Sequence, residues 1–266
     1  MKPKLFILPL GLLALSNSIF ADGIPSKSTY DWTGVYLGGY AGGASSARTT
    51  SSGPIIAGTT LFPDKSYSYD TDSSFIGGGT LGYNWQIGET PYLIGLEGEY
   101  GYLDMAASTA GPNNPIPQFI TATHSTNIGG SYGYGLVGAR AGYILNKSLL
   151  YVKSGAVFTS TQTNFDFNLH NTPTELINGL NGHSSVNNTS VGFAIGGGIE
   201  QALPTEWFAL AKHISVKAEY LYLGINTAKT STGNINLLGL TSLGTLTTSD
   251  SISGIHTAKI GVNYKF

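Results

Sequence analysis

The sequence predicts an all-β protein, an eight-stranded antiparallel up-and-down transmembrane β-barrel with four long extracellular loops. Three observations predict this fold class. Apolar and polar residues alternate with a period of two in eight separate windows, which is typical of strands with one apolar face. The connections between the windows alternate between short and long, and the chain begins with an export signal. Charged residues make up only 11% of the chain, against about 25% in soluble domains.

The first 21 residues have the features of a signal peptide. Lys2 and Lys4 precede the apolar run 5–15, and Ala21 supplies a small residue at the expected cleavage site. The run is too short for a membrane-spanning helix, which needs about 20 residues, although a retained anchor is the alternative. We therefore divide the chain into a signal peptide (1–21), a short periplasmic N-terminal segment (22–32) and an outer-membrane β-barrel (33–266).

Eight windows carry the alternation, each long enough for a tilted strand to cross a bilayer. They are residues 33–44, 74–87, 92–103, 132–145, 148–159, 189–203, 214–222 and 257–266. One side of each window is apolar. In chain order these sets are Val35 and Leu37; Phe75, Leu81, Tyr83, Trp85 and Ile87; Tyr92, Ile94, Leu96, Tyr100 and Tyr102; Val137, Ala139, Ala141, Tyr143 and Leu145; Leu150, Val152, Ala156 and Phe158; Val191, Phe193, Ile195 and Ile199; Ile214, Val216, Ala218, Tyr220 and Tyr222; Ala258, Ile260, Val262, Tyr264 and Phe266.

The connections divide into two kinds. Residues 88–90, 146–147 and 204–212 are short, whereas 45–73, 104–131, 160–188 and 226–252 are long and rich in Ser, Thr, Asn and Gly. Long structureless loops are uncommon in soluble domains, but outer-membrane barrels combine short periplasmic turns with long outer loops. We expect the four long stretches to be structureless and solvent-exposed, with both termini on the periplasmic side.

A sheet in lipid has to close on itself, because an open edge leaves backbone groups unsatisfied at several kcal/mol each. The apolar faces then meet lipid and the polar faces line the interior. Tyrosine and tryptophan near strand ends, such as Tyr83, Trp85 and Tyr264, are expected to form interfacial girdles. Trp32, just before the first strand, is expected in the periplasmic girdle. Glycine runs inside strands, such as 77–79 and 196–198, are expected to mark bends or close approaches.

Four acidic and four basic residues fall on the inward faces of the windows. They are Glu97, Glu99, Glu200 and Glu219, and Arg140, Lys153, Lys217 and Lys259. An eight-stranded barrel is just wide enough for side chains to fill, so these charges are expected to pair in a network that plugs the interior. A selective or gated polar channel is one alternative. Acid–base catalysis by Glu97 and Glu99, which share one face, is another.

The sequence carries no recognisable cofactor or metal motif. Cysteine is absent, and the five histidines lack the HxxxH or HExxH spacing of metal sites. The one pair considered for a membrane-embedded enzyme is His256 with Ser253. A net charge of −2 gives no nucleic-acid footprint. We therefore expect a non-enzymatic protein with no catalytic, metal or cofactor site and no nucleic-acid partner.

Several strand windows resemble those of the small opacity-protein-like outer-membrane barrels of proteobacteria. The similar stretches include DWTGVYLGG (31–39), GLEGEYGY (95–102) and IGVNYKF (260–266). The family includes surface antigens and haemin-binding proteins. The resemblance implies a location in the outer membrane of a Gram-negative bacterium, surrounded by outer-membrane lipid. It also implies that Tyr264 and Phe266 form a C-terminal signal read by the barrel-assembly machinery.

The expected function is a structural or surface-interaction role through the long extracellular loops, with a host surface or haemin as the candidate partner. His124, His170 and His183 lie in those loops and could ligate haemin. The alternative is a narrow pore or a haemin- or small-molecule-binding outer-membrane protein.

Overall fold

The structure is a computed structural model that describes most of the expected barrel. The described residues are 30–46, 48–56, 59–60, 67–70, 73–103, 105–111, 120–128, 133–169, 180–204, 213–225, 229–237, 241–252 and 254–266. The expected signal peptide and most of the 22–32 segment lie outside these residues, as does most of the 204–212 connection. In the described part of the chain, no helix is long and apolar enough to span a membrane.

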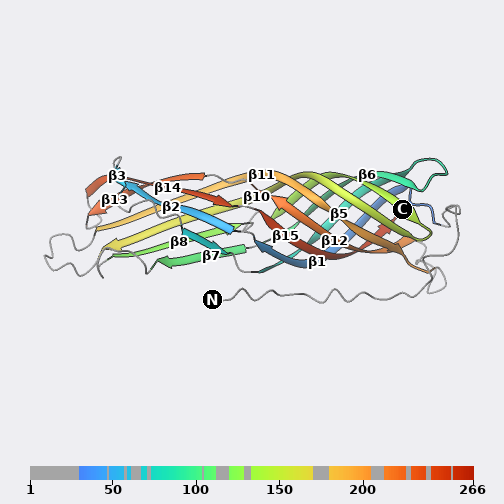
Figure 1. The fold of residues 1–266 in the computed structure, drawn as a ribbon, viewed down its shortest axis with the longest axis horizontal. Coiled ribbons are helices and arrows are strands. Elements are labelled where there is room, and N and C mark those ends of the chain that lie inside the picture. Colours follow the sequence, from blue (N-terminus) through green and yellow to red (C-terminus); the bar gives the residue numbers. More distant parts are fainter. Residues whose placement is uncertain are drawn as a thin grey trace.

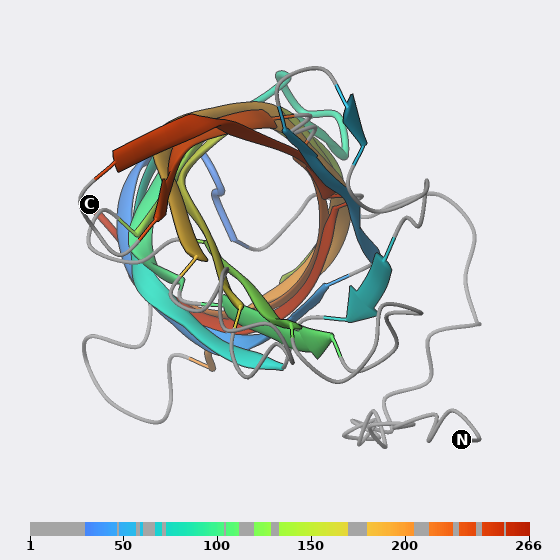
Figure 2. The same ribbon diagram turned by 90° about the vertical axis from the view of Figure 1, so that its left-hand side faces the viewer.

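Eight strands form a closed antiparallel barrel (Figures 1 and 2). They are β1 (Gly34–Ser46), β5 (Ser74–Gln86), β6 (Tyr92–Leu103), β9 (Tyr134–Leu145), β10 (Ser148–Leu169), β11 (Leu180–Ala202), β12 (Ile214–Gly224) and β15 (Ile255–Lys265). Each pairs with the next in this order, and β15 pairs with β1. The predicted eight-stranded up-and-down barrel is confirmed.

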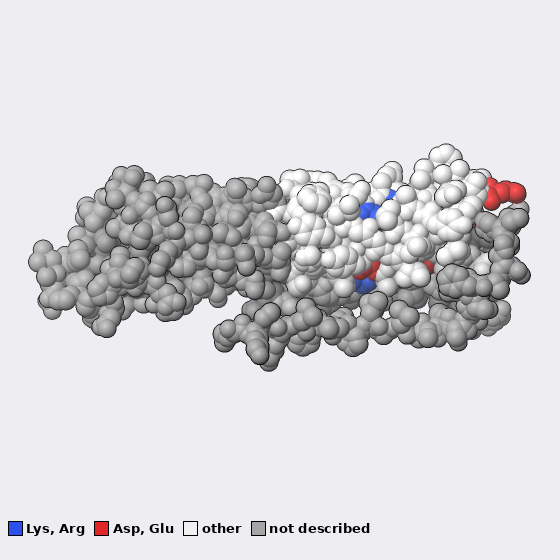
Figure 3. Space-filling view, viewed as in Figure 1, with Lys and Arg blue, Asp and Glu red and all other residues white. Residues whose placement is uncertain are grey.

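Side chains alternate between the outer wall and the interior along each barrel strand. On β15, Ile260 and Val262 are 67% and 50% exposed, whereas Lys259 and Asn263 on either side of this pair are buried. The apolar sets of the eight windows point outward in the same way. The described outer wall is therefore apolar, and the face of it seen in Figure 3 shows only small spots of charge.

Aromatic side chains form two belts on this wall. Tyr92 and Tyr143 are in contact near the end that carries the turns 88–90 and 146–147, with ring centroids 5.7 Å apart. Near the other end, Phe75 and Tyr102 lie 6.5 Å apart. Tyr92 and Tyr102 are ten residues apart on β6, about 33 Å along the strand. For strands tilted by about 45°, the belts are about 23 Å apart along the barrel axis, which matches the apolar band of outer-membrane barrels.

We call the end with the two turns the turn end. The turn 146–147 has Asn146 at φ 57°, a left-handed conformation that asparagine adopts more readily than most residues. Gly88 provides the corresponding positive φ, 56°, in the other turn. Both hairpins are tight, as the short connections predicted.

Within the described residues, seven further strands extend the sheet beyond the other end of the barrel, at the left of Figure 1. They are β2 (Arg48–Ile56), β3 (Thr59–Thr60), β4 (Tyr67–Asp70), β7 (Met105–Gly111), β8 (Ile120–Ile128), β13 (Lys229–Leu237) and β14 (Thr241–Ile252). We call this end, with the outer halves of β10 and β11, the extended end. β10 and β11 have 22 and 23 residues, about twice what a tilted strand needs to cross a bilayer.

The expectation that the four long stretches are structureless is therefore wrong. Each of 45–73, 104–131, 160–188 and 226–252 contains strand residues. Segments such as 229–237, in which only Ile235 and Leu237 are large and apolar, have too little hydrophobic alternation to be recognised as strands. Backbone pairing, as between β13 and β14, needs no apolar face outside a membrane, and threonine, common in these segments, is favoured in strands.

The apolar wall leads to a depth-dependent prediction. Ile260 lies near the middle of β15, whereas Ile87 follows β5 at the turn end. Ile260→Arg should lower the free energy of unfolding by roughly 2–4 kcal/mol, and the matched control Ile87→Arg by about 0–1 kcal/mol, because an arginine near the interface can reach water. Urea titration of protein refolded into lipid vesicles measures both. Equal losses would contradict a lipid-facing wall between the two belts.

Candidate functional site in the barrel interior

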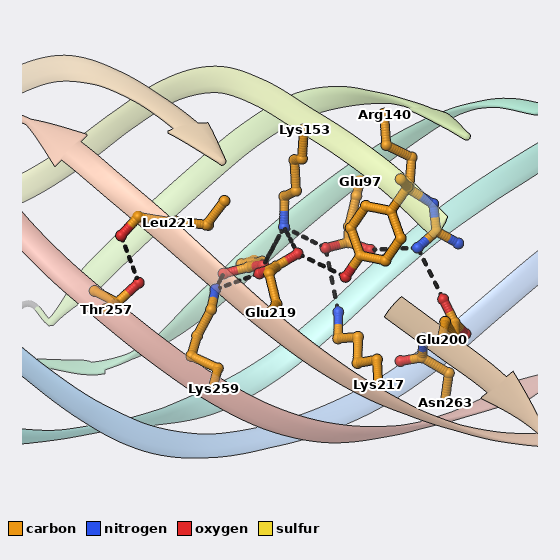
Figure 4. Close-up of polar contacts among 12 residues, drawn as sticks. Glu97, Arg140, Lys153, Glu200, Lys217, Glu219, Leu221, Thr257, Lys259 and Asn263 are labelled. Atoms are coloured by element: carbon orange, nitrogen blue, oxygen red, sulfur yellow. Dashed lines mark hydrogen bonds and ion pairs between the residues drawn. The ribbon is translucent and has the colours of Figure 1, made fainter. Parts of the chain in front are cut away.

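All eight charged residues singled out in the sequence lie inside the barrel and are buried. They come from six strands. They all lie in the interior because each occupies an inward position of the period-two alternation. The set is Glu97 and Glu99 on β6, Arg140 on β9, Lys153 on β10, Glu200 on β11, Lys217 and Glu219 on β12, and Lys259 on β15. Figure 4 shows most of them converging from opposite walls.

Lys153 lies at the centre of the larger group of charges. Its Nζ is 2.5 Å from Glu97 Oε1 and 3.3 Å from Glu219 Oε2, and it also pairs with Glu99 (Figure 4). Lys259 joins the same acids from β15, with Nζ 2.7 Å from Glu99 and 2.8 Å from Glu219. Lys217 completes the group at 3.3 Å from Glu97. Three ammonium groups thus face three carboxylates.

Arg140 organises a second group nearer the turn end. Its Nη1 is 3.0 Å from Glu200 Oε2 and 3.6 Å from Glu97 Oε2, so it connects the two groups. Its Nε donates to Asn84 Oδ1 at 2.8 Å. Glu200 also accepts hydrogen bonds from Ser215 at 2.5 Å and from Asn263 at 2.8 Å. These hydrogen bonds satisfy a carboxylate that would otherwise be costly to bury.

Tyrosines complete the network. Tyr36 donates to Glu97 at 2.5 Å and Tyr151 to Glu219 at 3.0 Å, while Tyr134 donates to Glu99. The Tyr40 ring lies 4.7 Å from Lys259 Nζ, within the range of a cation–π contact. Alternation in 148–159 puts Tyr151 on the inward side, but we expected tyrosines mainly in the interfacial girdles. The period-two alternation could have identified Tyr36 as an inward residue, because it lies between the outward Val35 and Leu37.

Glycines opposite these tyrosines provide the space for their rings. A side-chain carbon on Gly82 would overlap the Tyr36 ring, and one on Gly198 would lie 2.7 Å from the Tyr151 hydroxyl. Both contacts are too close for a real Cβ atom. At these two positions the strand glycines therefore allow the close approach that the sequence led us to expect.

Two apolar layers enclose the charges along the barrel axis. On β6 the inward residues follow the order Leu93, Glu97, Glu99 and Leu103, and the two leucines belong to separate buried clusters. The cluster on the extended side includes Tyr40, Ile76, Leu103, Met105, Tyr134, Leu136, Val157, Leu221, Leu223 and Ile255. The cluster on the turn side contains Trp32, Leu93, Ile144, Leu149, Tyr151 and Ala202.

Trp32 forms part of the turn-side layer, and its expected place in the periplasmic girdle is wrong. The indole is only 2% exposed and packs edge-on against Tyr30 at 4.8 Å. Lys265 holds this segment through the carbonyls of Asp31 and Thr33 and stacks over the Tyr30 ring at 5.2 Å. Burial raises the pKa of the Tyr30 phenol to about 12, with the charges of Glu200 and Asp31 adding to the shift. Residues 30–33 therefore cover the turn end of the barrel interior.

The interior carboxylates also have the spacing of a cation site. Oxygens of Glu97, Glu99 and Glu219 lie within 4.8 Å of one another. However, Lys153 pairs with all three and Lys259 with two of them. Lysine ammonium groups thus supply the positive charge that a metal ion would bring. The His256 considered for an enzyme faces the outer wall, where its Nδ1 is 2.6 Å from the Tyr220 hydroxyl; Ser253 lies outside the described residues.

A closed antiparallel barrel with an apolar outer wall, two aromatic belts and a charged interior defines a transmembrane β-barrel protein. The family model of the outer membrane protein beta-barrel domain matches residues 10–266. The chain belongs to this family and is an outer-membrane protein, as the sequence predicted.

Relatives and solved structures agree with this assignment. The chain is 27% identical over 247 residues to the 31 kDa outer-membrane immunogenic proteins of Brucella melitensis and Brucella suis, covering 90% of this chain and 85% of each relative. The crystal structure of the outer membrane protein OprG from Pseudomonas aeruginosa matches with a TM-score of 0.50 at 13% identity. That match covers 90% of this chain and 99% of OprG, and it supports the fold alone.

Removing one interior acid should unbalance the network. Glu219→Ala leaves Lys153 and Lys259 with less negative charge and Tyr151 without its acceptor, so the free energy of unfolding should fall by about 3–5 kcal/mol. The control is Glu89→Ala, at an exposed position in a turn, which should change stability by less than about 0.5 kcal/mol. Denaturant titration in detergent measures both. An unchanged midpoint for Glu219→Ala would contradict a buried, mutually neutralised network.

Proposed function

We propose that this protein is a non-enzymatic outer-membrane barrel whose interior is plugged and whose function lies on the strands beyond the extended end. In this proposal the barrel is an anchor and the extended sheet is a surface-interaction module. The one observation that carries the proposal is the filled interior. Charges balanced four against four lie between two apolar layers, and the interior of an eight-stranded barrel offers little space beyond its side chains.

The pairing argues against a narrow pore. Each interior lysine and the arginine contacts at least one glutamate, so an ion passing through would have to break several buried pairs. It would also have to cross the layer around Leu93 and Trp32 and the layer around Leu103, which offer few polar partners. A selective channel would instead be expected to keep a continuous polar lining.

The extended strands supply a large surface for recognition. β13 and β14 form a hairpin rich in Ser, Thr and Asn, and β14 continues into pairing with β2. The Brucella relatives are named outer-membrane immunogenic proteins, which fits a chain that presents such a surface outside the cell. A host surface is the partner class that we propose for this module.

Haemin is a second candidate partner of the same surface. Two of the histidines considered for it, His124 on β8 and His183 on β11, lie on extended strands that both pair with β10. His170 lies outside the described residues.

We also propose that residues 1–21 are removed on export and that Tyr264 and Phe266, whose rings are 5.2 Å apart, are recognised by the barrel-assembly machinery.

Cysteine labelling on intact cells tests which end faces outward. The chain has no cysteine, so Thr241→Cys in β14 and Lys147→Cys in the turn each create one thiol. A large membrane-impermeant maleimide should label Thr241→Cys and leave the control Lys147→Cys unlabelled until the outer membrane is opened. Labelling of Lys147→Cys alone on intact cells would reverse the topology and place the extended sheet in the periplasm.

A further inference from the structure

The outer wall is not uniform, because a groove of about 650 Å³ crosses five of its strands. Its floor is made of small residues, namely Gly95, Ala139, Ala141 and Ser154. Its sides include Tyr83 and Trp85 on β5, Ile94 and Leu96 on β6, Val152 on β10 and Ile195 on β11. Arg140 and Lys153 also border the groove, but their side chains are buried in the interior. The exposed lining is therefore almost entirely apolar, and the groove opens to the outside of the barrel.

Strand register explains the shape of the groove. Ala139 on β9 lies opposite Leu96 on β6 and Ser154 on β10, and Ala141 lies opposite Ile94 and Val152. Leu96 and Val152 are 68% and 65% exposed, so they stand above the small residues between them. Neighbouring strands are about 4.8 Å apart, which makes the depression on β9 about 10 Å wide between β6 and β10.

The groove lies in the half of the wall nearer the turn end. Ala141 is two residues from Tyr143, which belongs to the turn-end belt with Tyr92. Trp85, three residues before Gly88 in the turn, forms one side of it. Tryptophan is favoured where one edge of the ring meets hydrocarbon and the other meets the headgroup layer. The groove therefore runs from the headgroup level at the turn end toward the middle of the bilayer.

We propose that this groove is a binding site for one acyl chain of a phospholipid in the leaflet at the turn end. The groove is continuous with the lipid-facing wall, it is apolar, and its volume of about 650 Å³ is within the range of small-molecule sites. A flexible chain can lie along a depression one strand wide. A second copy of the barrel presents a convex wall, which would contact the ridges at Leu96 and Val152 and leave the floor uncovered.

Photocrosslinking with a phospholipid that carries a diazirine in its acyl chain tests the site. The wild-type protein, reconstituted in phospholipid vesicles, should give adducts concentrated on Ala139, Ala141 and Ser154 by mass spectrometry. Ala141→Phe should fill the groove and lower the yield of these adducts about fourfold or more. This fold-change corresponds to the free energy of burying roughly one methylene group. The matched control Ala258→Phe, on the exposed face of β15 outside the groove, should leave them unchanged.

Two results would overturn the proposal. One is an even spread of adducts around the barrel, or an equal yield in the two variants. The other is a wild-type dimer that Ala141→Phe converts to a monomer, since the groove would then be an interface between copies of this chain. Heat-modified mobility in gels verifies that each variant is folded. Ser154→Phe fills the same groove from β10 and is the second test variant if Ala141→Phe does not fold.

Discussion

The structure depends on one constraint, that no backbone hydrogen-bonding group can remain unpaired in lipid. The pairing of β15 with β1 meets it, because this register turns eight strands into a ring without an edge (Figure 2). Closure with eight strands fixes a narrow interior, and the period-two alternation assigns half of every strand to it. The inward residues must then fill that space and neutralise one another. The paired acids, bases and tyrosines are the result.

The interior also explains where function can be carried. Charges held by several partners, as Lys153 is by three glutamates, have little freedom to rearrange, and the apolar layers on both sides separate them from water. The wall contacts lipid. In the proposed function, recognition is assigned to the sheet beyond the extended end, where strands such as β10 continue far past the length required by a bilayer.

Much of the barrel could be predicted from the sequence because lipid imposes a strict pattern. The alternation in 257–266 and 214–222 placed Lys259, Lys217 and Glu219 inside, and their positions follow from parity alone. Parity does not show which acid meets which base, since that depends on strand stagger and side-chain reach. Alternation also fails for strands outside the membrane, which have no lipid-facing side. The polar sequences of β13 and β14 therefore look like loops. Trp32 was misplaced because a residue before the first strand has no alternation to assign its side.

Single-channel recording in planar bilayers tests the central claim that the interior is filled. Refolded protein, with insertion verified by protease protection in vesicles made in parallel, should give no conductance steps at either polarity. Charge substitutions such as Lys153→Gln should not change the ion selectivity of any residual leak. Regular conductance steps whose selectivity shifts in Lys153→Gln would show that ions pass along the charged network, and would contradict the account.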